Sequence, residues 1–511
     1  MNMQVFERIA IVVFLTVLAS TGTGVSAAAQ QEEWPTRGWR RSSPEAQGMD
    51  SKVLAEAFDE IRRRQISIHS LTIVRNGYLV LDAYFWPFQD NLLHDTASVT
   101  KSVTSTLVGI ATGHHGLNSV TQPVMTVLGA PSIANLDSRK KRLTVEHLLT
   151  MTSGLDCHHE QGEITLTQMR GSPDWIGFML DLPMVAEPGD VYEYCSGGMH
   201  LLSGIITKAT GVSALDFARR TLFAPLGIGA SAWPSDAQGI SHGWGDLHLQ
   251  PRDMAKIGYL WLRGGRWENR QLVPADWMRT AVQVHSHPGS SPGPGYGYGL
   301  WIYPDRSPPI FEGLGRGGQR ISVVPASDLV VVFTGGEFEP GDIGQFIGRA
   351  IKSDRALPEN SADAARLAIA VGAATEPPAA RPVTTAPTQA KVISGRTYVL
   401  DANPFDLRSF SLTFSGGATA ELQLELVDRL DGPRPIGLDG VPRVSPDGRF
   451  GLPVAVIGAW ESDSTFVLDY NEVGNINNRR FRLTFVDEGA SVELTERSDP
   501  LVTARYRGRA R

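Results

Sequence analysis

The chain has 511 residues, of which 42% are hydrophobic and 20% are charged, and its formal net charge is -7 at pH 7. This composition is typical of a soluble globular protein. Because a chain of this length exceeds one ordinary hydrophobic core, we expect two or three domains. The mild net charge and the lack of an Arg/Lys-rich stripe interleaved with aromatic residues argue against a nucleic-acid partner.

The first residues have the layout of a secretory signal peptide. Arg8 precedes an apolar run at residues 9–19, and small residues follow up to Ala29. This pattern predicts a signal peptide over residues 1–29, with cleavage after Ala27 or Ala29. The alternative is an uncleaved membrane anchor, for which the apolar run is short because a span takes roughly 20 residues. We therefore expect an exported bacterial protein, periplasmic or secreted, without a stable membrane span once the signal is removed.

Residues 34–355 predict one domain of mixed helices and strands. Residues 71–85 contain two strand-like runs around Asn76-Gly77, a dipeptide typical of a tight β-hairpin. Helices are predicted next at residues 100–112, 145–150, 200–209 and 214–222. Residues 321–334 indicate two more strands around a turn, and residues 345–353 a closing amphipathic helix. Strands at both ends with helices between them are typical of an α/β or α+β fold.

A change of composition separates this domain from a second one. Pro, Ala and Thr dominate residues 356–391, which is typical of a semi-extended linker. Residues 392–511 predict a small all-β domain, with an antiparallel barrel as one arrangement, because apolar and polar residues alternate there with a period of two. This second domain has no compact group of His, Cys or carboxylate residues that indicates chemistry of its own. Its strands are predicted at residues 409–414, 421–426, 465–470, 480–485 and 491–496.

Ser98 and Lys101 have the spacing of a serine nucleophile and its base. A serine hydroxyl is a weak nucleophile until a neighbouring base takes its proton. If Ser98 opens the helix predicted at residues 100–112, Lys101 lies one turn later on the same face. A buried lysine amine can act as a base, and the N–H groups at a helix N-terminus suit a developing oxyanion. The pattern therefore predicts a nucleophile at Ser98 and a proton acceptor at Lys101.

A second Ser-x-x-Lys match runs from Ser138 to Lys141. The pattern alone is weak, because roughly one accidental match is expected in a chain of this length. Ser138 and Lys141 lie in the charged stretch DSRKKR, where a lysine stays solvated and protonated. Ser98 instead precedes an apolar helix that can bury Lys101, so the first match is the stronger candidate.

Two further segments become informative only in combination with Ser98 and Lys101. Tyr194 can share the proton of a lysine ammonium and serve a leaving group, and Ser196 can hydrogen-bond the lysine or the substrate. The glycine-rich residues 313–319 permit close backbone approach to a ligand and supply N–H donors. Taken singly, a core tyrosine and a turn without function are the more common interpretations.

Cys157 and Cys195 are the only cysteines of the chain. In an exported protein an even pair is a disulfide candidate. Two buried thiols that never meet are the alternative.

Residues 40–355 resemble the serine β-lactamase and penicillin-binding-protein superfamily, in which these elements occur in the same order. The chain is similar in particular to the class C-like esterases, D-aminopeptidases and 6-aminohexanoate-dimer hydrolases, grouped as β-lactamase-related serine hydrolases. The resemblance is specific because many separate strings fall in order: ASVTKS at residues 97–102, HLLTMTSGLD at 147–156, PGDVYEYCS at 188–196, LFAPLGI at 222–228, LHLQPRDMAKIGYL at 247–260 and YGYGLWI at 296–302.

The resemblance implies catalytic roles for three residues. Ser98 is expected to be the acylated nucleophile, Lys101 the base and Tyr194 the proton shuttle. Ser196 lies where many members of the superfamily have Asn, which is a departure from their pattern. The expected substrate is a small-molecule ester or amide, cleaved without a metal or an organic cofactor.

The third motif of the superfamily departs further. It usually reads Lys-Thr-Gly or His-x-Gly, whereas the matching residues here are Gly313-Leu314-Gly315. Arg316 is the candidate replacement for the missing charge, and the backbone N–H groups of Ser98 and Arg316 are the expected oxyanion hole. In the superfamily the lysine helps to hold the carboxylate of penicillins and peptide C-termini. Its loss argues against a dedicated β-lactamase or D,D-carboxypeptidase and favours esters or amides without that requirement.

Other expectations also follow from the resemblance. The loops that contain Cys157 and Cys195 border the active site in this fold, so a disulfide between them rigidifies the rim of the pocket. Tyr298 and Trp301 are expected either to line the acyl pocket or to pack in the core.

Two other functions stay open at this point. One is a non-catalytic sensor or binding protein that keeps the fold, and the other is a true β-lactamase or D,D-peptidase. The intact set of Ser98, Lys101 and Tyr194 favours an enzyme over a sensor.

Overall fold

The computed structural model describes residues 34–511 except for 114–116, 130–131, 159–162, 290–292, 404–406, 428, 477, 488 and 497–502. Within this range Trp34–Arg511 forms one compact unit. The predicted signal peptide at residues 1–29 lies outside the described residues. In the part of the chain described, no single helix is long and apolar enough to cross a membrane. Only the bent pair Ser196–Thr210 and Ala214–Leu226 is long and apolar enough when its two helices are taken together.

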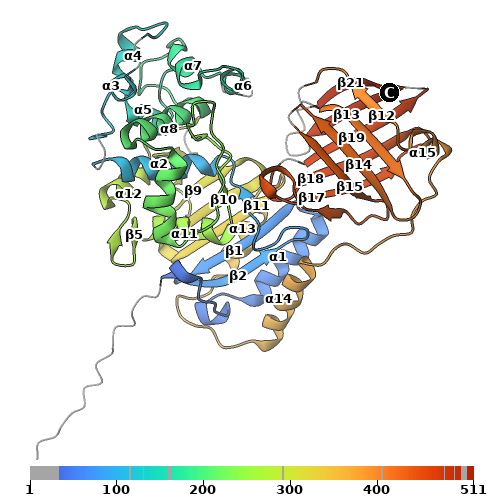
Figure 1. The fold of residues 1–511 in the computed structure, drawn as a ribbon. Coiled ribbons are helices and arrows are strands. Elements are labelled where there is room, and N and C mark those ends of the chain that lie inside the picture. The colour runs from blue at the N-terminus through green and yellow to red at the C-terminus, as the bar shows by residue number, and fades with distance from the viewer. Residues whose placement is uncertain are drawn as a thin grey trace, which may run out of the picture. The chain divides into compact units, whose positions relative to one another are not determined.

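A seven-stranded antiparallel sheet forms the centre of the first domain (Figure 1). Its order is β2-β1-β11-β10-β9-β8-β7, so the N-terminal hairpin pairs with the last strand of the domain. Asn76 and Gly77 have φ values of 51° and 76°, as a two-residue turn of type I′ requires, which confirms the predicted hairpin. The strands are β1 (Ile68–Arg75), β2 (Tyr78–Tyr84), β7 (Gly295–Tyr296), β8 (Trp301–Tyr303), β9 (Ile310–Gly315), β10 (Gln319–Val324) and β11 (Leu329–Gly335).

Both faces of this sheet are buried around β11. Leu329, Val331 and Phe333 pack into one core, whereas Val330 and Val332 pack into the other. This split follows from the alternation of side chains along a strand. A strand that is covered on both faces reads as a continuous apolar run, which explains the sequence of β11.

Helices cover both faces of the sheet (Figure 1). On one face α1 (Ser51–Arg64) packs against α13 (Gly341–Ala350) and α14 (Ser361–Ala374). On the other face α11 (Pro251–Leu262) packs on β10 and β11, and α2 (Val99–Ala111) packs on β9. The remaining helices of the domain include α3 (Val124–Leu128), α4 (Ser138–Arg142), α5 (Val145–Leu149), α6 (Ile164–Arg170), α7 (Trp175–Asp181), α8 (Ser196–Thr210), α9 (Ala214–Ala218), α10 (Ala224–Leu226) and α12 (Ala275–Ala281).

Every residue of α2 is buried, so its polar side chains need partners inside the domain. Thr104 Oγ1 donates to Gly243 O at 2.9 Å, and Ser105 Oγ donates to Tyr298 O at 2.7 Å. These bonds hold the helix to the two loops beside it. The residue that precedes this fixed helix is Ser98.

The segment predicted as a linker, residues 356–391, is helical in its first part. There α14 packs against α1 and buries Leu367 and Ala370. The alanines that mark this composition are also the strongest helix formers, so an Ala-rich segment with a packing partner becomes a helix. Backbone without helix or strand is found at residues 356–360 and at the proline-rich residues 375–387.

The C-terminal residues form an antiparallel β-barrel. The strand order is β15-β14-β13-β12-β21-β20-β19-β18-β17-β16, and a pairing of Gly437 with Ile457 brings β15 next to β17. The five strands predicted from the sequence lie within β13, β14, β18, β19 and β20, which confirms an all-β domain. The strands are β12 (Thr397–Leu400), β13 (Leu407–Phe414), β14 (Thr419–Leu426), β15 (Leu430–Gly437), β16 (Arg443–Ser445), β17 (Val454–Trp460), β18 (Thr465–Glu472), β19 (Asn478–Val486), β20 (Gly489–Glu496) and β21 (Thr503–Ala510).

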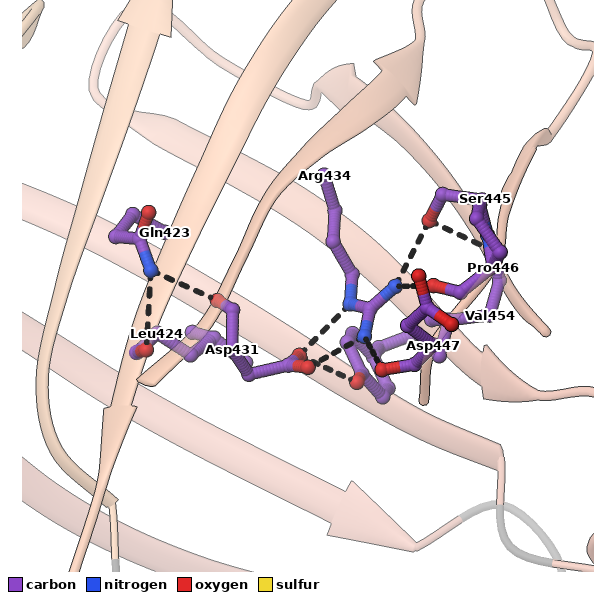
Figure 2. Close-up of polar contacts among 9 residues, drawn as sticks. Gln423, Leu424, Asp431, Arg434, Ser445, Pro446, Asp447 and Val454 are labelled. Atoms are coloured by element: carbon purple, nitrogen blue, oxygen red, sulfur yellow. Dashed lines mark hydrogen bonds and ion pairs between the residues drawn. The ribbon is translucent and has the colours of Figure 1, made fainter. Parts of the chain in front are cut away.

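A buried ion pair in this barrel joins Arg434 to Asp431, both on β15 (Figure 2). Arg434 Nε donates to Asp431 Oδ2 at 2.8 Å, and its other two nitrogens donate to Ser445 Oγ and to the carbonyls of Pro446 and Asp447. Burial acts to raise the pKa of Asp431, but hydrogen bonds from Arg434 and Tyr470 outweigh it and hold this pKa below its usual value. Since each guanidinium nitrogen has an acceptor, the network fixes the barrel and leaves no donor for a ligand.

Candidate active site

Ser98 lies immediately before α2, at the end of a constrained turn. Ala97 has a φ of 46°, a left-handed conformation that is uncommon for a residue with a side chain. The carboxylate of Asp95 accepts a hydrogen bond from Ala97 N at 2.8 Å and so supports this turn. Burial raises the pKa of Asp95, and the nearby His248 partly opposes that shift. The turn presents Ser98 at the N-terminus of the helix.

Lys101 lies one helical turn after Ser98, and the two side chains meet. Lys101 Nζ donates to Ser98 Oγ at 2.8 Å, and only 2% of Lys101 is exposed. The second Ser-x-x-Lys match differs, because Ser138 and Lys141 are both exposed. Its neighbour Lys140 is nevertheless fully buried, with its amine on the carbonyls of Ala134, Leu180 and Leu182.

The amine of Lys101 has a second partner that the sequence did not reveal. Its Nζ donates to the backbone carbonyl of Trp244 at 2.9 Å. The ring of His242 stacks on Trp244 with centroids 4.6 Å apart, and His242 Nδ1 lies 2.7 Å from Asp246 Oδ2. A carbonyl belongs to every residue, so no residue type at this position could have indicated its role.

Tyr194 completes the arrangement. Lys101 Nζ lies 4.7 Å from the centroid of the Tyr194 ring. On its other side the ring is roughly parallel to that of Trp301, with centroids 6.4 Å apart. The three side chains singled out by the sequence, Ser98, Lys101 and Tyr194, therefore lie together.

The residues after Tyr194 are fixed by the N-terminus of α8 and by a disulfide. The structure joins Cys157 to Cys195 with Cα atoms 5.6 Å apart, so the two cysteines are not separate thiols. Ser196 is 2% exposed, and its backbone N–H donates to Glu163 Oε1 at 3.2 Å. Its Oγ has no hydrogen-bond partner among the described residues. The expected hydrogen bond between Ser196 and Lys101 is therefore not formed among the described residues, where the amine bonds Ser98 and Trp244.

The glycines of the third motif allow β9 to lie very close to the segment that contains Ser98. A Cβ atom on Gly313 would lie 3.0 Å from Ser102 Oγ, and one on Gly315 would lie 2.7 Å from Thr96 O. A side chain at either position would push the strand away from α2. The close approach of β9 at Gly313 and Gly315 therefore disfavours a lysine or histidine side chain at either position.

Arg316 follows this strand and is exposed. Its charge lies near enough to Asp95 to act on that carboxyl and favour a lower pKa. Burial is the larger effect, so the pKa of Asp95 is raised overall. Its carbonyl accepts a hydrogen bond from Gln319 Nε2 at 3.2 Å, and the same nitrogen donates to Gly335 O at 2.6 Å. Gln319 thus braces the turn that presents the backbone N–H of Arg316.

A cavity of about 540 Å³ opens beside Tyr194. Its walls are Val191, Tyr192, Glu193, Tyr194, Pro288, Gly289 and Trp301. Trp301 thus lies where a pocket residue is expected. Tyr298 does not, because it is buried with its hydroxyl on the carboxylate of Glu146 and its ring against Trp277. Of the two expectations for Tyr298, its burial shows packing in the core, and its assignment to the substrate pocket is corrected. Burial, followed by the bond to Glu146, also raises the pKa of Tyr298.

Metal-binding side chains do not gather at this site. In the ranges that the structure describes, no three His, Cys, Asp or Glu residues come together in a group able to hold a metal ion.

Comparison with known proteins identifies the family of this domain. The sequence profile described as Beta-lactamase matches residues 47–352, which is more than half of the chain. The chain belongs to the beta-lactamase family. The central sheet, the helices around it except α14, and the contact of Ser98 with Lys101 lie within the matched beta-lactamase residues.

Relatives within the beta-lactamase family include several hydrolases. The chain is 24% identical over 292 residues to a 6-aminohexanoate-dimer hydrolase of Paenarthrobacter ureafaciens, a match that covers 53% of this chain and 74% of the relative. It is 30% identical over 208 residues to penicillin-binding protein 4 of Amycolatopsis lactamdurans, covering 39% and 51% of the two chains. A solved structure of a candidate 6-aminohexanoate-dimer hydrolase from Bacillus anthracis matches with a TM-score of 0.51 and 20% identity, covering 61% and 85%. The chain is therefore a member of a hydrolase family with the beta-lactamase fold.

Proposed function

We propose that this protein is a serine hydrolase that cleaves carboxylic esters or small amides through an acyl-enzyme on Ser98. The observation that carries the proposal is the 2.8 Å contact between Lys101 Nζ and Ser98 Oγ in a buried setting. A hydroxyl becomes a nucleophile when a base within hydrogen-bond reach takes its proton. The position of Tyr194 over the same amine supports a shared proton path.

The proposed reaction has two halves. In the first, Ser98 Oγ bonds to the substrate carbonyl carbon while its proton passes to the unprotonated amine of Lys101. The leaving alcohol or amine then takes a proton by way of Tyr194 as its bond to the carbonyl carbon breaks. In the second half a water molecule bonds to the acyl carbon and gives a proton to the same pair of groups. The bond between Ser98 Oγ and the acyl carbon then breaks, Ser98 Oγ takes the proton back, and the carboxylic acid is released. The backbone N–H groups of Ser98 and Arg316 are the proposed donors to the oxyanion.

The third motif supports a substrate without a required carboxylate. Gly313 and Gly315 contribute no cation, and the packing of β9 against α2 leaves no room for one at either position. Arg316 lies next to the motif but is exposed. A penicillin or a peptide C-terminus needs a cationic partner for its carboxylate. Neutral esters and amides do not, which is why they are the proposed substrate class.

Export is part of the proposal. The pattern of residues 1–29 supports a cleaved signal peptide, and the disulfide between Cys157 and Cys195 supports folding in an oxidising compartment. N-terminal sequencing of the protein recovered from the periplasm of a bacterial host should find a chain that starts at Ala28 or Gln30. A cytoplasmic chain that still begins at Met1 would contradict this part of the proposal.

Turnover of a chromogenic short-chain ester tests the activity. The wild-type protein should hydrolyse 4-nitrophenyl butyrate, and Ser98→Ala should lose this activity while it keeps the same thermal unfolding midpoint. Rapid hydrolysis of a chromogenic cephalosporin together with little ester turnover would favour a true β-lactamase. No turnover of either compound would favour a sensor or binding protein.

A further inference from the structure

The loop between β18 and β19 of the barrel contacts the segment that leads to Ser98. The carbonyl of Gly474 accepts a hydrogen bond from Asp95 N at 2.7 Å. Gly474 has a φ of 93°, and a Cβ atom there would lie 2.3 Å from the carbonyl oxygen of Leu93. Only glycine fits this position without displacing one of the two backbones. The barrel thus holds residues 93–95 by a direct backbone contact.

The same loop also contacts the turn of the third motif. Ile476 is fully buried, and a Cβ atom on Gly317 would lie 2.6 Å from its Cγ2. Gly315, two residues earlier, lies similarly close to Thr96, since a Cβ atom on Gly315 would lie 2.7 Å from Thr96 O. The turn is therefore in contact with the Ser98 segment at Gly315 and with the barrel at Gly317.

Apolar packing surrounds these two contacts. Phe88, Ala455 and Val473 form a small buried cluster shared by the two domains. The ring of Phe450 lies 4.9 Å from that of His248, which is itself paired with Asp95 across β3 (His94–Asp95) and β4 (His248–Leu249). Contacts that are buried and close-packed transmit a displacement instead of absorbing it. The loop is therefore coupled mechanically to the turn that presents Ser98.

We propose that Gly474 and Ile476 are positioning residues of the hydrolase site, through which the β-barrel sets the spacing between Ser98 and the third-motif turn. The inference rests on the proposed acyl-transfer function, because that spacing matters only if the N–H groups of Ser98 and Arg316 bind an oxyanion. The barrel is then a part of the active site. An error of about 1 Å in such a site costs up to roughly a hundredfold in rate.

The test compares two isoleucines of the barrel in the full-length protein. Ile476→Ala removes the contact with Gly317, whereas Ile436→Ala removes an equally buried side chain from the barrel core, where it packs near Gly458 and not on the hydrolase site. Ile476→Ala should lower kcat for 4-nitrophenyl butyrate by about tenfold or more, with a smaller change in KM. Ile436→Ala should lower the unfolding midpoint and leave kcat near the wild-type value. Ile476→Val, which removes only Cδ1 and keeps the Cγ2 atom that contacts Gly317, should keep most of kcat.

The outcomes separate this inference from the function on which it rests. If the wild type turns over the ester and Ile476→Ala has the same kcat as Ile436→Ala, the contact is merely structural and the inference is overturned while the function stands. If Ile476→Ala does not fold, the comparison between Ile476→Leu and Ile436→Leu decides, because leucine keeps the side-chain volume but lacks the Cγ2 atom that contacts Gly317; a lower kcat is expected for Ile476→Leu alone. An inactive wild type overturns the proposed function and this inference with it.

Discussion

Replacing Lys101 with Met separates the role of its amine from the role of its bulk. Methionine keeps the length of the buried side chain but cannot accept a proton or donate to Ser98 Oγ and Trp244 O, which Lys101 contacts at 2.8 and 2.9 Å. Loss of a positioned proton-transfer group costs about 10²–10⁴ in rate. We expect kcat for a short-chain ester to fall about a thousandfold, which corresponds to about 4 kcal/mol in the activation barrier.

The expected effect on stability is small. The carbonyl of Trp244 loses its donor, which costs about 1–3 kcal/mol. That loss is offset in part because the apolar methionine side chain carries no cost of desolvating a buried polar amine. The unfolding free energy of Lys101→Met should therefore change by about 2 kcal/mol at most.

Lys140 supplies the matched control. It is also a fully buried lysine, and its amine donates to three carbonyls, those of Ala134, Leu180 and Leu182. Lys140→Met leaves all three carbonyls without this donor and should cost about 3 kcal/mol or more in unfolding free energy. Because Lys140 lies away from Ser98, kcat should stay at the wild-type value.

The assay pairs steady-state hydrolysis of 4-nitrophenyl butyrate with urea unfolding of both variants. Lys101→Met should have the lower kcat of the two variants, and Lys140→Met should have the lower free energy of unfolding. The reasoning is refuted if Lys101→Met keeps more than a tenth of the wild-type kcat. It is refuted equally if Lys140→Met loses as much activity as Lys101→Met.

Three further predictions follow from the geometry. Tyr194→Phe should lower kcat about 10²–10⁴-fold with little change in KM, and an unchanged kcat would exclude the phenol from proton transfer. Replacing Cys157 and Cys195 together by Ser removes a link between residues 38 apart and should cost about 3–4 kcal/mol of stability, which thermal unfolding with and without reductant would measure. Burial lowers the pKa of His94 to about 4, below the usual value near 6.5, so the unfolded chain binds a proton that the folded chain does not. His94 alone should therefore lower the free energy of unfolding by about 2 kcal/mol as the pH falls from 6.5 to 5. Urea unfolding of His94→Gln that shows the same loss of free energy between these pH values would contradict this.

Local sequence signals predicted those parts of the fold that depend on short-range geometry. Asn76 and Gly77 specify a turn by their own conformational preferences, and the hairpin is found there. β15 escaped notice because it contains Gly432, Pro433 and Pro435, which are unfavourable in strands. They are tolerated here because β15 stands at one end of the strand order and its ladder with β14 is irregular. The helix α14 was hidden by a composition that is shared with linkers, and its packing partner α1 is remote in sequence.

For the site, too, the sequence predicts features that depend on local spacing and misses those that depend on long-range contacts. The roles of Ser98 and Lys101 depend on side-chain chemistry at a fixed helical spacing, so the sequence indicates both residues. The carbonyl of Trp244 and the side chain of Ile476 act through contacts with residues far away in the chain. Such contacts exist only once the chain is folded, and no residue type at either position announces them. Tyr298 is the opposite case. It is an aromatic residue close to Trp301 in the sequence, but its side chain packs in the core and does not line the pocket.

Covalent labelling tests the central claim most directly. A fluorophosphonate probe forms a bond between its phosphorus and a serine oxygen only when that oxygen is activated, and fluoride leaves. Intact-mass analysis of the full-length protein should show one adduct, and peptide mapping should place it on Ser98. Ser98→Ala should show none, and Lys101→Met should label far more slowly than the wild type. An unlabelled wild type, or an adduct that maps to another residue and persists in Ser98→Ala, would contradict a nucleophile at Ser98.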